Sequence, residues 1–206
     1  MKDLSDSILH NVLSTIFDMI LVNLCFLLCC LPVITIGTAV SALYISIYHL
    51  QIGEGHVIRT FWGAFQKALR IGIRCWLIWL ALFTIAAADF LIIGLFWHNP
   101  VRYILLGILL GMMILLLIFG SALFSTLSFY SSIKSASVNA FRLGVGNLFR
   151  FIPVCFLFLT PALLLLFWTY GFLLFMAVFL LIWFSLSAYL SLLLLKSLFT
   201  QHLGSI

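Results

Sequence analysis

Residues 103–124 read YILLGILLGMMILLLIFGSALF, an apolar run without one charged side chain. The run is longer than the roughly 20 residues that an α-helix needs to cross the hydrocarbon core of a bilayer. Strands of a membrane barrel alternate apolar and polar residues with a period of two, and this run does not. It therefore predicts a transmembrane helix.

The composition of the chain extends this prediction to the whole molecule. Of 206 residues, 66% are hydrophobic and 7% are charged, whereas soluble domains carry roughly 25% charged residues. Backbone groups in hydrocarbon must be paired within the protein, so unbroken apolar runs must be helices. We expect one all-α integral membrane domain over residues 1–206, a polytopic transmembrane helical bundle with about six spans.

The first two spans are expected to be short, on either side of the stretch CLPVITIG at residues 30–37. Pro32 lacks a backbone N–H and disfavours helix at the residue before it, and Gly37 permits a turn. Each side offers about 25 Å of helix, slightly less than a bilayer core. The predicted hinge at Pro32 and Gly37 is either a hairpin between two short spans or a kink in one span that follows an interfacial helix.

Two polar stretches interrupt the later apolar runs, which we place near residues 75–97, 102–130, 151–169 and 171–195. Residues 59–70 and 139–150 predict amphipathic helices that lie in the headgroup layer, because aromatic residues repeat at helical spacing among cations. We expect both helices to be docking faces for a partner. The candidate docking residues are Arg59, Phe61, Phe65, Lys67, Arg70, Phe141, Arg142 and Arg150.

The basic residues predict the orientation of the chain. Two spans separate the two basic stretches, so both stretches lie on the same side of the membrane. By the positive-inside rule that side is the cytoplasm. We therefore expect a multi-pass protein of the cell membrane with a cytoplasmic C-terminus.

An internal repeat relates the two polar stretches. Ser41-Ala42-Leu43 matches Ser121-Ala122-Leu123 at the same offset at which Phe61 matches Phe141 and Arg70 matches Arg150. Residues 37–80 and 117–160 are thus predicted to be two repeat units. Both units begin on the same side of the membrane, so the repeat is parallel rather than inverted.

Asp89 is the ionisable residue nearest the middle of a predicted span. A carboxylate in hydrocarbon costs about 2.5–3.5 kcal/mol on insertion scales, so we expect it to face the bundle interior and find a partner. One reading makes Asp89 a binding or coupling residue for a proton, a cation or a polar substrate. The alternative is a structural hydrogen bond to a neighbouring helix, or a carboxylate that reaches the outer interface.

Several classes of function are not predicted. The chain has no phosphate-binding GxxxxGK[ST] loop, no HExxH and no GxSxG, so we expect no enzyme, no catalytic residue and no cofactor. The five cysteines lie in apolar runs and read as small hydrophobic residues, so we expect no metal. The net charge of +5 sits between spans, which points to the lipid bilayer rather than to nucleic acid.

The block LCCLPVITIGTAVSALYISIYHLQIGEGHVIRTFWGAFQKALRIG at residues 28–72 resembles the signature region of the YesL family (DUF624) of bacterial membrane proteins. The resemblance rests on Leu31-Pro32, Ile36-Gly37, Ala42-Leu43-Tyr44 and the pair Phe61 and Phe65. Members of that family usually carry more lysines where this chain has AFQKALRIG. The resemblance implies genes placed beside carbohydrate ABC importers and glycan-degrading enzymes, and it carries over no catalytic residue.

We therefore expect a non-enzymatic accessory membrane protein that works with the permease subunits of a carbohydrate ABC importer. Two alternatives stay open. The chain could be a small transporter that uses Asp89, or a scaffold for the assembly of envelope glycans. The sequence does not predict the oligomeric state.

Overall fold

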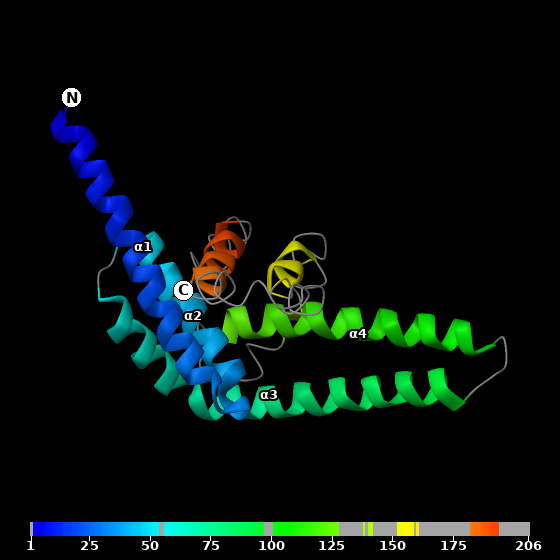
Figure 1. Ribbon diagram of the computed structural model, residues 1–206. Coiled ribbons are helices and arrows are strands. Elements are labelled where there is room, and N and C mark those ends of the chain that lie inside the picture. Colours follow the sequence, from blue (N-terminus) through cyan, green and yellow to red (C-terminus); the bar gives the residue numbers. More distant parts are fainter. Residues whose placement is uncertain are drawn as a thin grey trace, which may run out of the picture.

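The computed structural model describes residues 2–53, 56–96, 101–127, 138, 140–141, 152–158, 160 and 182–193. Its elements are α1 (Lys2–Cys30), the 3₁₀ turn η1 (Val33–Thr35), α2 (Ile36–Gln51), α3 (Val57–Phe96) and α4 (Val101–Thr126). Residues 152–158 and 182–193 are also helical. Figure 1 shows the second half of α3 beside α4 as a long hairpin, with α1 and α2 at one end of it.

The predicted all-α class is confirmed, because every described element is a helix. Among the described residues, four helical stretches are long and apolar enough to cross a membrane: Val12–Cys30, Val33–Gln51, Val57–Leu95 and Val101–Thr126. The spans predicted at residues 151–169 and 171–195 fall largely outside the described residues. Within them the structure describes helix at 152–158 and 182–193.

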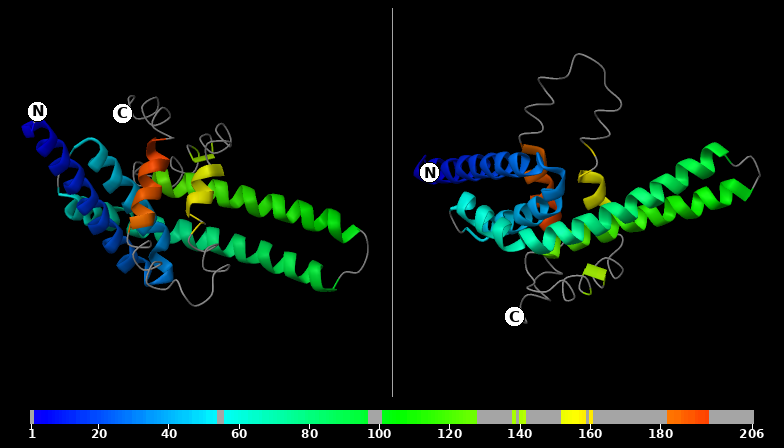
Figure 2. Two further views of the ribbon diagram at one scale, coloured as in Figure 1. Left: turned by 45° about the horizontal axis from the view of Figure 1, so that its top comes forward. Right: turned by 90° about the horizontal axis from the view of Figure 1, so that it is seen from below.

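The break at Pro32 is a hairpin. α1 ends at Cys30, and the Thr35 hydroxyl donates hydrogen bonds to the carbonyls of Cys29 (2.6 Å) and Pro32 (2.8 Å). The first of these bonds pairs a carbonyl that the end of α1 leaves without a helical partner. α1 and α2 then run side by side in opposite directions (Figures 1 and 2). The alternative of one kinked span is therefore wrong.

Gly37 does not form the turn that its sequence position suggested. It is the second residue of α2, and a Cβ built on it would lie 2.6 Å from the Phe124 ring and 2.8 Å from the Cβ of Trp76. The chain reverses over residues 31–35 instead. Gly37 is therefore required for a close helix crossing rather than for a turn conformation.

α2 lies at the centre of the packing. Nine of its sixteen residues are buried, namely Gly37, Thr38, Ala39, Ser41, Ala42, Leu43, Tyr44, Ser46 and Ile47. Most of these side chains are small, which lets neighbouring backbones come close in a helical membrane protein. The Ser41 hydroxyl donates to the carbonyl of Phe124 at 2.8 Å and so joins α2 to the end of α4.

α3 is one continuous helix of 40 residues, about 60 Å along its axis, and it bends where it leaves α2 and turns along α4 (Figures 1 and 2). The separate interfacial helix predicted over residues 59–70 is therefore wrong: this stretch is the first half of α3, and the predicted span from residue 75 is its second half. Figures 1 and 2 show the first half of α3 beside α2 and the second half beside α4. The two halves of α3 therefore pack on different neighbours.

Two further glycines mark the point where α3 changes neighbours. A Cβ on Gly72 of α3 would lie 2.5 Å from Thr38 Oγ1 and 3.1 Å from Thr38 Cα of α2. A Cβ on Gly120 of α4 would lie 2.5 Å from Trp79 Nε1 of α3. Because neither position leaves room for a methyl group, α3 passes from α2 to α4 at close range.

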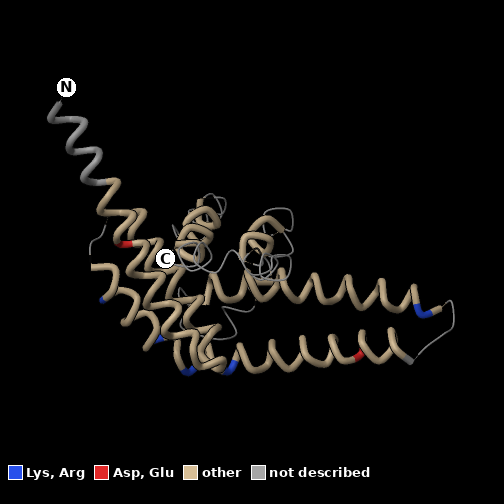
Figure 3. The backbone as a smooth tube through the Cα atoms, in the orientation of Figure 1, with Lys and Arg blue, Asp and Glu red and all other residues tan. Residues whose placement is uncertain are grey.

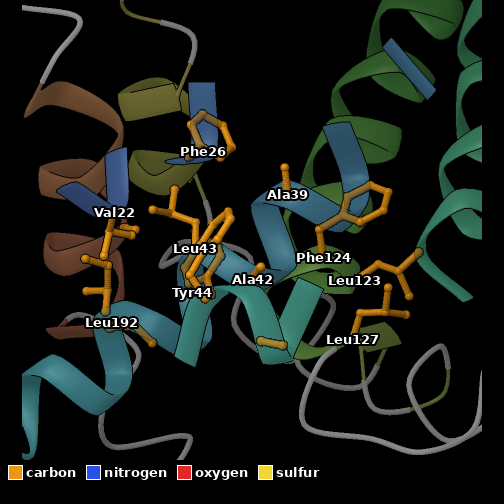
Figure 4. Close-up of a cluster of buried hydrophobic side chains, with 14 of the residues drawn as sticks. Val22, Phe26, Ala39, Ala42, Leu43, Tyr44, Leu123, Phe124, Leu127 and Leu192 are labelled. Carbon is orange, nitrogen blue, oxygen red and sulfur yellow. The ribbon is translucent and has the colours of Figure 1, made fainter. Parts of the chain in front are cut away.

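The buried side chains of these helices form one cluster. Figure 4 shows Val22 and Phe26 of α1 near Leu43 and Tyr44 of α2. Residues 182–193 close this side, since the Ser185 hydroxyl donates to the carbonyl of Met19 at 2.8 Å. Segments from both ends of the chain therefore enclose α2.

The close crossing predicts a large effect of one added methyl group. Gly72→Ala places a Cβ against the Thr38 backbone, and overpacking of this kind costs about 1–3 kcal/mol. We expect a lower apparent Tm for the purified protein in detergent. Gly94→Ala on the same helix is the matched control, because nothing lies within 4 Å of a Cβ there. Equal melting of the two variants would show that the crossing is not tight.

Candidate functional site

The first half of α3 separates its residues into a buried face and a basic face. Val57, Phe61, Ala64 and Ala68 are buried, which follows helical spacing along one side. The basic face is defined by the exposed side chains of Arg59, Lys67, Arg70 and Arg74. Figure 3 shows these cations as a blue series along α3. Exposed charge of this density requires water, lipid headgroups or a partner.

Phe61 belongs to the core rather than to the docking face that we predicted. Its side chain is fully buried, and Phe65 is half-buried at a ring-centroid distance of 6.2 Å from it. The apolar stripe is correctly predicted, but it packs on α2 instead of facing a partner. Trp62 was missed: it is 53% exposed and stacks on Phe65 at 5.8 Å. The sequence held a signal for Trp62: it lies three residues after Arg59 and five before Lys67, among the cations of the same helix.

A groove of about 680 Å³ opens between α1 and the start of α3. Its polar side chains are Asp18 on α1 and His56, Arg59 and Gln66 from α3 and the residue before it. Its remaining lining residues are Leu21, Val57, Ile58, Trp62 and Gly63. Opposite charges thus stand in one mostly apolar groove, whose volume is typical of ligand sites.

The backbone at His56 is unusual. His56 has φ = 72°, a left-handed conformation that residues other than glycine rarely adopt. Its carbonyl accepts the first backbone hydrogen bond of α3, from Thr60 N–H at 3.1 Å. This conformation turns the chain directly into α3, and it fixes the imidazole-bearing residue at the edge of the groove.

A second, smaller cavity of about 190 Å³ lies where α2, α3 and α4 cross. Aromatic rings form much of its wall: Trp76 and Trp79 stack at 5.3 Å, and Tyr44 stacks with Phe158 at 6.0 Å. The Trp79 N–H donates to the carbonyl of Leu116 at 2.9 Å. The cavity is therefore built mainly for apolar contact at the centre of the fold.

Asp89 lies in the second half of α3 and is exposed. No described residue forms a hydrogen bond or an ion pair with it, and it lines neither the groove nor the small cavity. Figure 3 shows it as the red position on the long hairpin, remote from the blue series. The expectation that Asp89 faces the bundle interior is wrong for the described part of the chain, because the Asp89 side chain is exposed although Ala86, one turn before it, is buried.

The second predicted docking helix is only partly described. Phe141 is 59% exposed, whereas its repeat partner Phe61 is fully buried. Arg142 and Arg150 lie outside the described residues. Ser41-Ala42-Leu43 and Ser121-Ala122-Leu123 both enter the central packing, but the repeat of residues 37–80 and 117–160 stays a prediction.

Comparison with known proteins gives one match. Residues 19–90 match the model of the family described as "Protein of unknown function, DUF624". The matched stretch begins in α1, contains all of α2 and ends just after Asp89 in α3. No curated protein and no solved structure matches the chain.

The exposure of Asp89 leads to a prediction for stability. If no internal partner holds the carboxylate, Asp89→Leu removes a polar group from an apolar surface and costs no hydrogen bond. We expect the apparent Tm in detergent to stay equal or to rise. Ala88→Leu, at an exposed neighbouring position, is the control. If Asp89→Leu lowers the apparent Tm well below that of Ala88→Leu, Asp89 has an internal partner.

Proposed function

We propose that this chain, whose residues 19–90 match the DUF624 family model, is a non-enzymatic accessory protein of the cell membrane. In this proposal it binds the permease subunits of a carbohydrate ABC importer through the basic face of α3, on the cytoplasmic side. The C-terminus then lies in the cytoplasm as well. The proposal needs no cofactor and no catalytic residue.

The exposed charge of the basic face is the observation that carries this proposal. Lys67 and Arg70 are exposed on α3. The opposite side of the helix packs on α2 through the buried side chains of Phe61 and Ala64. No described residue forms an ion pair with Lys67 or Arg70. A rigid cationic surface steers and orients an acidic partner, and charge at such a face acts mainly on recognition and association rate.

The carbohydrate part of the proposal comes from the resemblance of residues 28–72 to YesL-like proteins. Genes of such proteins tend to lie beside carbohydrate importers and glycan-degrading enzymes. The family match covers the basic face completely, since Arg59 and Arg74 both lie within residues 19–90. The stretch that carries the resemblance is therefore also the stretch that presents the proposed docking surface.

Reversal of one charge on the basic face tests the proposal. With Arg70→Glu we expect co-purification with the permease subunits to fall about tenfold, because a recognition contact becomes a repulsion. Affinity-tagged protein would be isolated from membranes that contain the permeases, and the permease yield would be measured by immunoblot. Arg102→Glu is the control, since Arg102 is the second residue of α4 at the far end of the hairpin and its change of charge is the same.

Other outcomes distinguish the alternatives. Unchanged permease yield with Arg70→Glu contradicts docking through the basic face. Substrate flux in liposomes that hold this chain alone, lost with Asp89→Asn, would favour the small transporter. Co-purification with enzymes of envelope glycan assembly in place of permeases would favour the scaffold.

A further inference from the structure

We propose that the groove between α1 and the start of α3 binds the headgroup of an aminophospholipid, a lipid with a phosphate and a primary ammonium group. The groove carries a carboxylate on α1 and a guanidinium on α3. A ligand that satisfies both must itself be dipolar. The proposal does not rest on the proposed docking function: of the basic face only Arg59 lines the groove, and Lys67 and Arg70 do not.

The α3 side of the groove suits the phosphate. Arg59 offers several N–H donors that match phosphate oxygens, and His56 adds an imidazole beside it. Arg59 is the third residue of α3, where backbone N–H groups have no partner within the helix and the helix dipole favours an anion. Positive charge and open donors therefore gather on one wall.

The α1 side suits the ammonium group. Asp18 lines the groove without forming a hydrogen bond or an ion pair with any described residue. A primary ammonium offers three donors, of which Asp18 accepts one or two and the side-chain oxygen of Gln66 can accept another. A lipid with an anionic headgroup alone would leave the Asp18 carboxylate beside a phosphate.

An exposed apolar stripe on α1 fits an acyl chain. Phe17, Leu21, Leu24 and Leu28 recur at spacings of four, three and four residues, so they share one side of the helix. Phe17, Leu24 and Leu28 are 61%, 44% and 58% exposed, and Leu21 lines the groove. The stripe runs about 16 Å along α1 and passes the headgroup position. This continuity favours a membrane lipid over a soluble zwitterion.

Trp62 would lie at the junction of the headgroup and the acyl chains of a bound lipid. It lines the groove next to Ile58 and is 53% exposed. Indole rings prefer the headgroup level of a bilayer, because one edge is polar and the rest is apolar. The groove therefore combines charged residues that suit a headgroup with an indole that suits the level between headgroup and acyl chains.

Lipid retention by the purified full-length protein tests the proposal. The protein in detergent would be mixed with equimolar phosphatidylethanolamine, phosphatidylglycerol and phosphatidylcholine of identical acyl chains, and bound lipid counted by native mass spectrometry. We expect phosphatidylethanolamine to be retained about fivefold over each of the other two, as one extra charge-assisted contact allows. Soluble glycerophosphoethanolamine in excess should displace it only partly, because the acyl contacts remain.

Two variants test which part of the headgroup contacts each wall of the groove. Asp18→Asn should abolish the preference over phosphatidylglycerol, whereas Arg59→Gln should lower retention of all three lipids about fivefold, since each carries a phosphate. Arg102→Gln is the control and should retain lipid like the unaltered protein, since it removes the same charge from α4, outside the groove. Each variant is compared at an apparent Tm within a few degrees of the unaltered protein, and Arg59→Lys replaces Arg59→Gln if that variant unfolds.

Three results would overturn the proposal. Equal retention of the three lipids would show that the groove does not discriminate between headgroups. A preference for phosphatidylglycerol would assign the groove to an anion alone. Complete displacement by glycerophosphoethanolamine would identify a soluble ligand instead of a lipid. Any of these could occur while Arg70→Glu still lowers permease yield, so the two proposals fail separately.

Discussion

The fold depends on how closely α3 approaches α2 at Gly72 and Thr38. At this point a Cβ on Gly72 would meet not only the Thr38 hydroxyl but also Thr38 Cα, at 3.1 Å. A contact with backbone cannot be relieved by a change of rotamer. Since van der Waals packing and small residues drive helix association in membranes, this crossing sets the positions of both helices.

The neighbouring contacts follow from this crossing. Once α3 passes Thr38, Trp76 lies against Gly37 and Trp79 lies against Gly120, so α3 moves from α2 to α4 within two turns. The Trp79 N–H then finds the carbonyl of Leu116 at 2.9 Å, which fixes the register of the long hairpin. The small aromatic cavity remains beside these contacts because flat indole rings fill the crossing incompletely.

The two halves of α3 differ because their surroundings differ. The first half exposes four cations and buries its apolar stripe on protein, whereas the second half exposes Ile78, Leu82 and Ile85. Charged residues are costly in hydrocarbon, and large apolar residues are costly in water. One continuous, bent helix therefore joins a charged surface to an apolar hairpin, and both proposals use its first half.

Hydropathy and spacing in the sequence predicted the helical class, the break at Pro32 and the amphipathic stripe after Arg59. They could not predict what each apolar face meets, because lipid and a protein core are equally apolar. Phe61 and Gly37 were misplaced for this reason: both are packing positions that only the tertiary structure reveals. The continuity of α3 was readable, since no proline occurs between residues 57 and 96.

The groove could not be predicted in the same way. Asp18 and Arg59 are distant in sequence, and only the α1–α2 hairpin followed by α3 brings them to one opening. Asp89 illustrates the opposite error. Its rarity in an apolar span predicted an internal partner, but its side chain is exposed in the described structure, and burial of a charge cannot be inferred from hydropathy alone.

The central claim is that α3 is a single helix with two environments, and cysteine labelling along it is the most direct test. In a variant without the five native cysteines, single cysteines would replace Trp62, Gln66 or Arg70, and Ile78, Leu82 or Ile85. All six positions are exposed on the protein, so labelling by a charged maleimide reports the surroundings alone. The account predicts fast labelling at the first three positions and labelling slower by at least about tenfold at the last three. Uniform labelling along the whole helix would contradict it.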